Sequence, residues 1–292
     1  MLVKSYAKLN LYLEVLKLRK DNYHSIKTIF ERIDLCDKII LKTRRDKKIR
    51  VICASKDVPR NRTNLAYRSA KLLQDKFKLD RGVDIKIIKR IPVGAGLGGG
   101  SSNAAFTLLG LNRLWKLRLG QKELARYARK IRSDVAFFIY DYHYALGVGR
   151  GDNVTPLRAL NKLNLSHILV VPKIKVSTPL IYRRWDELRL KKATLTGSPS
   201  DVKILTSALL KKELTKVDSA LFNSLETVTA GRYFEVKRIR ENLAQAGVKA
   251  ILMSGSGPAV FGITSSRKEA LGFSRQLRKI DKSWQVFVTK TV

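Results

Sequence analysis

A glycine-rich stretch at Pro92–Ala105 constrains the fold and function of this chain more than any other feature. It holds five of the 18 glycines of the chain within seven residues, followed by two serines. Glycine has no Cβ, so a backbone rich in it turns tightly and brings several N–H groups close to one ligand. The residues after the loop show helical spacing, and the N-terminus of a helix attracts anions. The sequence therefore predicts a phosphate-binding loop.

The patterns on both sides of this loop predict a strand before it and a helix after it. Val83–Ile87 alternates apolar and polar residues, as a half-buried strand does. Ala104, Leu108, Leu111 and Trp115 recur at the spacing of a helix face that packs against a core. A tight strand-to-helix turn would need only two or three glycines. We therefore interpret the loop as a binding element.

Two other nucleotide-binding motifs fit the loop less well. Gly94, Gly96 and Gly99 match the dinucleotide fingerprint, but that motif needs an acidic residue about 20 positions further on, at the end of a second strand. The nearest acidic residue, Glu123, lies in a helical pattern. A Walker A loop ends in Gly-Lys-Ser or Gly-Lys-Thr, and this loop contains no lysine. The cations that face a bound phosphate must therefore come from elsewhere in the chain.

The chain is strongly basic, with 59 Lys and Arg against 24 Asp and Glu and a formal net charge of +35. Such a charge attracts polyanions. The basic residues are spread along the chain, however, and the densest run, Lys42–Arg50, is interpreted as a solvated hairpin loop. No nucleic-acid recognition motif accompanies the charge. We therefore expect no nucleic-acid partner and attribute the charge to attraction for phosphorylated small molecules.

Composition also argues against a membrane protein and a transition-metal protein. No run near 18 apolar residues is present, and the chain starts without the apolar segment of a signal peptide. Cys36 and Cys53 make no metal or redox spacing, and the three histidines are scattered. We expect a cytoplasmic protein with no membrane association and no metal site made by protein side chains alone.

The chain length and a change of pattern near its middle predict two domains. Glycine-rich Leu146–Asp152 and then Asn161–Ser166 precede a new predicted strand, His167–Val171. We place the boundary near residue 160, which gives domains at 1–160 and 161–292. The second half is predicted to contain a strand at Ser177–Tyr182, a surface loop at Leu195–Asp201, helices near 201–214 and 234–246, and a strand–turn–strand unit at Ala250–Phe261.

Polar side chains elsewhere give weaker signals when each is taken alone. Lys8 and Asn10 lie on one face of a predicted strand, Tyr6–Leu13, which by itself fits an ordinary amphipathic strand. Tyr23 and His24 are adjacent, a combination suited to stacking on and hydrogen-bonding a nucleobase. Asp134 lies at a helix–strand junction, where an aspartate is most often a cap or turn residue.

Three segments in order resemble the motifs of the galactokinase–homoserine kinase–mevalonate kinase–phosphomevalonate kinase (GHMP) superfamily. They are Tyr6–Leu11, the Pro92–Ala105 loop and Met253–Gly257. Within the superfamily the chain is similar to members that act on a cytidine-diphosphate-linked methylerythritol. That similarity rests on Ala7–Leu11, Tyr23-His24, Gly96–Ser102, Asn112–Trp115 and Ser133–Phe138.

The resemblance implies a two-domain α+β GHMP kinase fold. Its N-terminal domain would be like the second domain of ribosomal protein S5, and its C-terminal domain would be ferredoxin-like. The implied reaction transfers the γ-phosphoryl group of ATP, with Mg²⁺, to the 2-hydroxyl of the cytidine-diphosphate-linked methylerythritol, a step of non-mevalonate isoprenoid biosynthesis. We expect a monomer or a homodimer.

The resemblance also implies a role for each site residue. Asp134 would be the catalytic acid/base at the acceptor hydroxyl, and Lys8 its partner. Asn10 would hold the acceptor, and Tyr23, His24 and Tyr182 would surround its cytosine. The residues implied to bind ATP are Asn64, Lys89, Gly94, Gly96, Gly98, Gly99, Gly100, Ser101 and Ser102.

Two alternatives stay open at this point. One is another GHMP kinase with a mevalonate-type or sugar acceptor, against which Tyr23 and His24 argue. The other is a non-catalytic RNA-binding protein on the same fold, against which Lys8 and Asp134 argue. The chain departs from the usual family pattern near the acceptor, at Arg132, Ala136 and Asp141–Tyr144.

Overall fold

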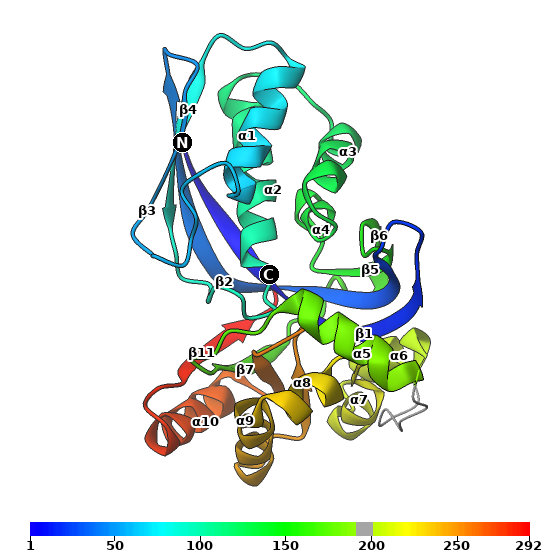
Figure 1. The fold of residues 1–292 in the computed structure, drawn as a ribbon. Helices are drawn as coiled ribbons and strands as arrows, with labels where there is room; N and C mark the ends of the chain where they lie inside the picture. The colour runs from blue at the N-terminus through cyan, green and yellow to red at the C-terminus, as the bar shows by residue number, and fades with distance from the viewer. Residues whose placement is uncertain (191–200) are drawn as a thin grey trace.

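The computed structural model describes residues 1–190 and 201–292, which form two sheets, each with helices packed against it (Figure 1). The α+β class predicted from the sequence is confirmed. None of the helices in the described ranges combines the length and the apolar character that crossing a bilayer requires.

The larger sheet has seven strands, in the order β3-β4-β2-β1-β8 with β5 and β6 attached through β2. β4 lies between β2 and β3, so the basic run Lys42–Arg50 does not close a hairpin, and that interpretation is wrong. β8, from the second half of the chain, pairs with β1 in this sheet. The domain boundary near residue 160 stays a prediction. The strands are β1 (Leu2–Leu18), β2 (His24–Arg44), β3 (Ile49–Cys53), β4 (Gly82–Ile88), β5 (Tyr144–Gly149), β6 (Asn153–Pro156) and β8 (Phe222–Asn223).

Three helices pack against the larger sheet, α1 (Leu65–Lys76), α2 (Gly99–Leu114) and α4 (Val135–Ile139), and α3 (Gln121–Ile131) packs on these helices. The predicted helix after the glycine loop is α2, and its predicted apolar face is confirmed. Ala104, Leu108 and Leu111 have no exposed surface, and Trp115 at the end of the helix is 1% exposed. This burial fixes α2 against the sheet, so the start of the helix is held rigidly where the glycine loop ends.

The smaller sheet has four antiparallel strands in the order β11-β7-β10-β9. Along the chain the four strands are β7, β9, β10 and β11, and in the sheet β7 lies between β11 and β10. This order is the ferredoxin-like arrangement expected from the resemblance. The remaining elements are the short 3₁₀ helix η1 (Arg158–Leu160), β7 (Ser166–Val171), α5 (Thr178–Leu190), α6 (Val202–Lys211), α7 (Leu214–Ala220), α8 (Glu226–Arg232), α9 (Phe234–Gln245), β9 (Ala250–Met253), β10 (Val260–Thr264), α10 (Arg267–Ile280) and β11 (Gln285–Lys290).

One predicted element of the second half has the wrong type. The sequence predicts a strand at Ser177–Tyr182, but the helix α5 begins at Thr178 and includes the rest of this segment. Pro179 is tolerated in the first turn of a helix, where its missing N–H costs nothing. Ile181 and Trp185, four residues apart, are both buried and hold the helix on the core. The β-branched and aromatic residues of this short window favour a strand locally, and tertiary packing overrides them.

The other predictions for this half agree with the structure where it can be compared. α6 and α9 confirm the helices near 201–214 and 234–246, and β9 and β10 confirm the strand–turn–strand unit. The loop predicted at Leu195–Asp201 lies outside the described residues except for Asp201. That residue caps α6 by accepting a hydrogen bond from the backbone N–H of Lys203.

Candidate active site

A cavity of about 1050 Å³ is lined by residues from both halves of the chain. The glycine loop, β1, the start of α4 and the start of α5 all contribute to its wall. The structure brings together every site residue predicted from the sequence except Ser102. A cavity of this size has room for a nucleotide and part of a second substrate.

The glycine loop is fixed by close backbone contacts to β1 and to the turn between β9 and β10. The backbone N–H of Lys8 donates to the carbonyl of Leu97 at 3.1 Å, and the hydroxyl of Ser254 donates to the carbonyl of Gly96 at 3.1 Å. A Cβ on Gly96 would lie only 2.0 Å from the carbonyl oxygen of Ser254. The three motifs recognised in the sequence therefore meet, and glycine at position 96 is required for the contact.

Backbone conformation and helix geometry both suit this loop to anions. Gly94, Gly96 and Gly98 have φ values of 71°, 78° and 69°, in the region that side chains disfavour. α2 starts directly after them, and its first-turn residues Gly99–Ser101 line the cavity. The N–H groups of a first helical turn lack intrahelical partners and carry partial positive charge. The loop and helix start can thus hold phosphate oxygens without a lysine in the motif.

Behind the loop lies a buried polar network that contains Ser102. Ser102 is fully buried, and its hydroxyl is 2.7 Å from that of Ser5. Asn103 donates to Ser5 and to Asp37, both at 2.9 Å, and Lys89 donates to Asp37 at 2.5 Å. Ser102 therefore supports the loop from behind instead of lining the cavity. Lys89 does line the cavity, but its charge is matched by Asp37.

Asn64 also lines the cavity, and its side chain is engaged locally. Its amide oxygen accepts from the backbone N–H of Ala66 and caps α1, while its amide nitrogen donates to the carbonyl of Pro59. These bonds shape the segment that leads into α1. The predicted contact between Asn64 and ATP stays a prediction.

Lys8 and Asp134 both line the cavity and interact electrostatically. Lys8 is buried, and its ammonium donates to the amide oxygen of Asn10. Burial lowers the pKa of Lys8 from 10.5 to about 8, while the carboxylate of Asp134 opposes this shift and the guanidinium of Arg132 adds to it. Burial and the charge of Asp134 also raise the pKa of Tyr182. Lys8, Arg132 and Asp134 therefore form one charged group, and the neutral phenol of Tyr182 lies within its electrostatic reach.

Aromatic side chains line the cavity next to the charged group. The ring of His24 stacks on Tyr182 with centroids 5.2 Å apart and an interplanar angle of 29°. His24 is buried, whereas Tyr23 is 53% exposed and lies under the guanidinium of Arg150. The predicted trio of Tyr23, His24 and Tyr182 is brought to one place. Flat rings with an adjacent imidazole suit the recognition of a nucleobase.

The sequence reasoning missed Asp186, which lies 2.8 Å from Nε2 of His24 and also lines the cavity. Asp186 orients the imidazole ring, because a carboxylate at this distance holds a proton on Nε2. Tyr182 and Asp186 are four residues apart and share one face of α5. Because the sequence predicts a strand at Ser177–Tyr182, it gives no sign that Tyr182 and Asp186 lie on the same face of a helix. Arg132 was noticed only as a departure from the family pattern, and its effect on Lys8 depends on the fold.

Comparisons with known proteins agree with this geometry. The family described as GHMP kinases N terminal domain matches residues 64–142, and GHMP kinases C terminal matches residues 205–282. The chain is 43% identical to a 4-diphosphocytidyl-2-C-methyl-D-erythritol kinase of Geobacillus sp. (strain WCH70), covering 90% of this chain and 88% of that protein. It is 42% identical to the protein of the same name from Bacillus velezensis, covering 90% of this chain and 87% of that one.

Solved structures give the same result. A crystal structure of 4-(cytidine 5'-diphospho)-2C-methyl-D-erythritol kinase matches with a TM-score of 0.82 and 32% sequence identity, and the match covers all of both chains. The mevalonate kinase of Methanococcus jannaschii matches with a TM-score of 0.74 at 14% identity, covering 100% of this chain and 98% of that one. At that identity the likeness shows the shared fold alone.

Proposed function

Because this chain belongs to the 4-diphosphocytidyl-2-C-methyl-D-erythritol kinase family of GHMP kinases, we propose that it transfers the γ-phosphoryl group of ATP to the 2-hydroxyl of a cytidine-diphosphate-linked methylerythritol. One observation carries the proposal. A single cavity is lined by the glycine loop, by Lys8 and Asp134, and by Tyr23, His24 and Tyr182. It therefore has a phosphate end and an aromatic end, with the charged group near Asp134.

ATP fits the phosphate end through backbone groups more than through side-chain charge. The helix start at Gly99–Ser101 supplies N–H groups, whereas Lys89 already pairs with Asp37. Among the described residues, no three His, Cys, Asp or Glu side chains gather to hold a metal. Mg²⁺ in kinases is usually held by substrate phosphates and one or two protein oxygens. The hydroxyl of Ser101, in the first turn of α2, is a cavity oxygen that would suit this role and leaves Asp134 free to act as the base.

The charged group supplies the chemistry that phosphoryl transfer needs. Bound ATP contributes the γ-phosphoryl group, whose bond to the β-phosphate oxygen breaks as the acceptor oxygen bonds to its phosphorus, releasing ADP. Asp134 orients the acceptor hydroxyl and takes up its proton. Lys8, held by Asn10, places a positive charge beside the transferring group. Such transfer depends mainly on alignment and charge neutralisation, and a fixed cation in a buried site provides both.

A panel of acceptors tests the proposed function. Turnover of ATP is measured with the cytidine-diphosphate-linked methylerythritol, with mevalonate, with galactose and with no acceptor. We expect turnover only with the cytidyl-linked acceptor, because only that molecule has a base for the aromatic end of the cavity. Turnover with mevalonate or galactose would instead support another GHMP kinase activity. No turnover with any acceptor would support a non-catalytic protein on this fold.

The pKa of Lys8 predicts how activity depends on pH. We expect kcat to fall as the pH rises through about 8, because Lys8 then loses the proton that gives it its charge. Replacing Arg132 by Gln removes a neighbouring positive charge, so it should raise the pKa of Lys8 and move this fall to higher pH. The check is kcat against pH for the wild type, Arg132→Gln and Lys130→Gln. Lys130 is an exposed cation two residues away, outside the cavity. An unmoved fall in Arg132→Gln, or the same movement in both variants, contradicts the assignment.

A further inference from the structure

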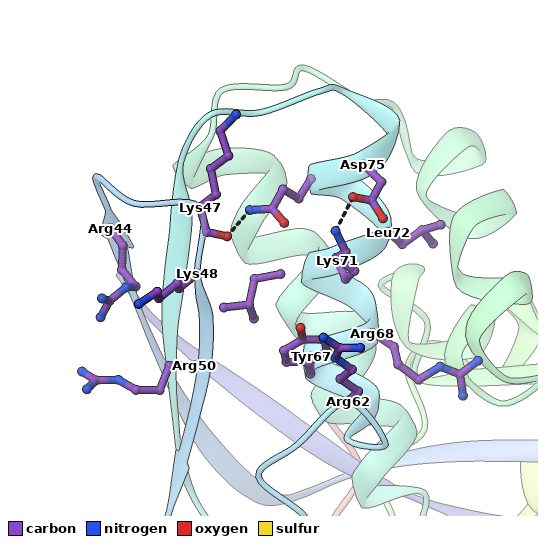
Figure 2. A pocket seen from close by; sticks show the side chains of 12 residues that line it. Arg44, Lys47, Lys48, Arg50, Arg62, Tyr67, Arg68, Lys71, Leu72 and Asp75 are labelled. Atoms are coloured by element: carbon purple, nitrogen blue, oxygen red, sulfur yellow. Dashed lines mark hydrogen bonds and ion pairs between the residues drawn. The ribbon is translucent and has the colours of Figure 1, made fainter.

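A second cavity, of about 930 Å³, lies between α1 and the segment that joins β2 to β3 (Figure 2). Seven of the residues that line it are Arg or Lys, and one is Asp. We call this cavity the basic groove. The segment from β2 to β3 contributes Arg44, Lys47, Lys48 and Arg50. The loop before α1 and the helix itself contribute Arg62, Arg68 and Lys71.

The positive charges of the basic groove exceed the carboxylates that pair with them. Arg44 and Arg50 share Asp84, and Arg44 also pairs with Asp46. Lys47 pairs with Asp80, and Lys71 pairs with Asp75. Seven cations therefore face four carboxylates. Within residues 1–190 and 201–292, no carboxylate forms an ion pair with the three remaining cations, which are Lys48, Arg62 and Arg68.

The groove is preformed, and part of its lining is apolar. The side-chain amide of Gln74 donates to the carbonyl of Lys47 at 2.8 Å and to that of Arg81 at 3.1 Å, which ties the segment between β2 and β3 to α1. Ile49, Tyr67 and Leu72 line the groove and are half-buried, whereas Lys48 and Arg62 are exposed. Figure 2 shows Tyr67 beside Arg62 and Arg68, across from Arg44 and Arg50. An aromatic ring thus lies between two sets of cations.

We propose that the basic groove binds single-stranded nucleic acid, an activity separate from the kinase reaction. The exposed cations on its two sides would contact successive phosphates, and Tyr67 would stack on a base. A small anion is bound best where donors converge in an enclosed site, and these cations are instead exposed along an open groove. The net charge of +35 adds a general attraction for a long polyanion.

The proposal reverses the expectation drawn from the sequence. In the sequence the basic residues are spread along the chain, and the run Lys42–Arg50 is interpreted as a solvated hairpin loop. The fold places this run opposite α1, so cations more than a dozen residues apart in the sequence line one groove. Arg68 lines both the groove and the kinase cavity, and it is therefore left out of the test.

A pair of triple variants tests the proposal in the full chain. The groove variant is Lys48→Gln/Arg62→Gln/Lys71→Gln, whose residues lie outside the kinase cavity. The matched control, Lys268→Gln/Arg275→Gln/Lys279→Gln, removes the same three charges from the exposed face of α10 in the other half. Binding of a fluorescent single-stranded RNA of about 16 nucleotides is measured by anisotropy over a salt series. Kinase turnover of both variants reports that they fold.

We expect the groove variant to bind the RNA roughly tenfold or more weakly at low salt, with the slope of log K against log salt reduced by about 2, the value for three lost phosphate contacts. The control variant should bind the RNA within about twofold of the wild type. A surface charge that does not contact a phosphate contributes little to RNA binding, because salt screens its attraction for the RNA. A further variant, Tyr67→Leu, keeps an apolar side chain but removes the flat ring. It should weaken binding by roughly tenfold without changing the salt slope.

Four results would overturn the proposal. The first is no RNA binding by the wild type at about 0.1 M salt. The second is equal weakening in the groove and control variants, which indicates general charge attraction. The third is inorganic triphosphate displacing the RNA at an equal concentration of phosphate groups, which indicates a small-anion site. The fourth is duplex RNA binding as tightly as the single strand, with Tyr67→Leu unchanged.

Discussion

Asp134→Asn should lower kcat by about 10²–10⁴, the range for loss of a general acid–base group. Asparagine keeps the size of the side chain but cannot take up the proton of the acceptor hydroxyl. The KM for ATP should change little, because the glycine loop and the start of α2 hold the phosphates. The measurement is steady-state kinetics with the cytidyl-linked acceptor, with Asp80→Asn as the control. Asp80 is an 82% exposed carboxylate outside the kinase cavity.

The effect of Asp134→Asn on Lys8 must be separated from the loss of the base. The carboxylate of Asp134 raises the pKa of Lys8 against the effect of burial, so its removal should move that pKa below about 8. The kinetics are therefore compared at a pH near 6 as well as near 8, since Lys8 keeps its proton at the lower pH. A kcat that recovers to near the wild-type value at low pH would show that Asp134 acts only through Lys8. Near-normal turnover at every pH would remove Asp134 from the catalytic group.

Gly96→Ala should damage the protein far more than Gly94→Ala, although both glycines have positive φ. Each substitution costs about 1–2 kcal/mol for a side chain in the left-handed region. At Gly96 the new Cβ would also lie 2.0 Å from the carbonyl oxygen of Ser254, whereas at Gly94 nothing lies within 4 Å. Overpacking of this kind adds about 1–3 kcal/mol. The free energy of unfolding should therefore fall by about 2–5 kcal/mol for Gly96→Ala and by about 1–2 kcal/mol for Gly94→Ala.

The same pair of variants tests the role of the loop in positioning ATP. Moving the loop away from the β9–β10 turn breaks the hydrogen bond from Ser254 to Gly96 and displaces the start of α2. A displacement near 1 Å is enough to lower kcat/KM for ATP by about 10². Urea unfolding and ATP kinetics on both variants check these expectations. Equal losses at the two positions would show that backbone conformation alone, and not the contact with Ser254, requires the glycine.

Local sequence patterns predicted much of the site and the fold. The density of glycines at 94–100 indicated a phosphate-binding loop, and the spacing of Ala104, Leu108 and Leu111 indicated the helix α2 that follows it. The alternation in Tyr6–Leu13 placed Lys8 and Asn10 on one face of a strand. These predictions agree with the structure because they depend on local properties. Those properties are the backbone preference of glycine and the spacing of apolar residues, which recur every 2 residues in a strand and every 3.6 in a helix.

The partners of several polar side chains in and behind the site were decided by the tertiary structure alone. Asp37 neutralises Lys89 from 52 positions away, Ser102 turns toward Ser5 instead of the cavity, and Asp186 reaches His24 across 162 positions. The basic groove likewise exists only because the segment from β2 to β3 lies against α1. The sequence by itself determined which segments become strand, loop and helix wherever the local pattern was strong. Pairs such as Lys89–Asp37 and His24–Asp186 depend on contacts between distant segments. The local sequence pattern does not encode such pairs, because hydrophobic burial of the whole chain decides where those segments lie.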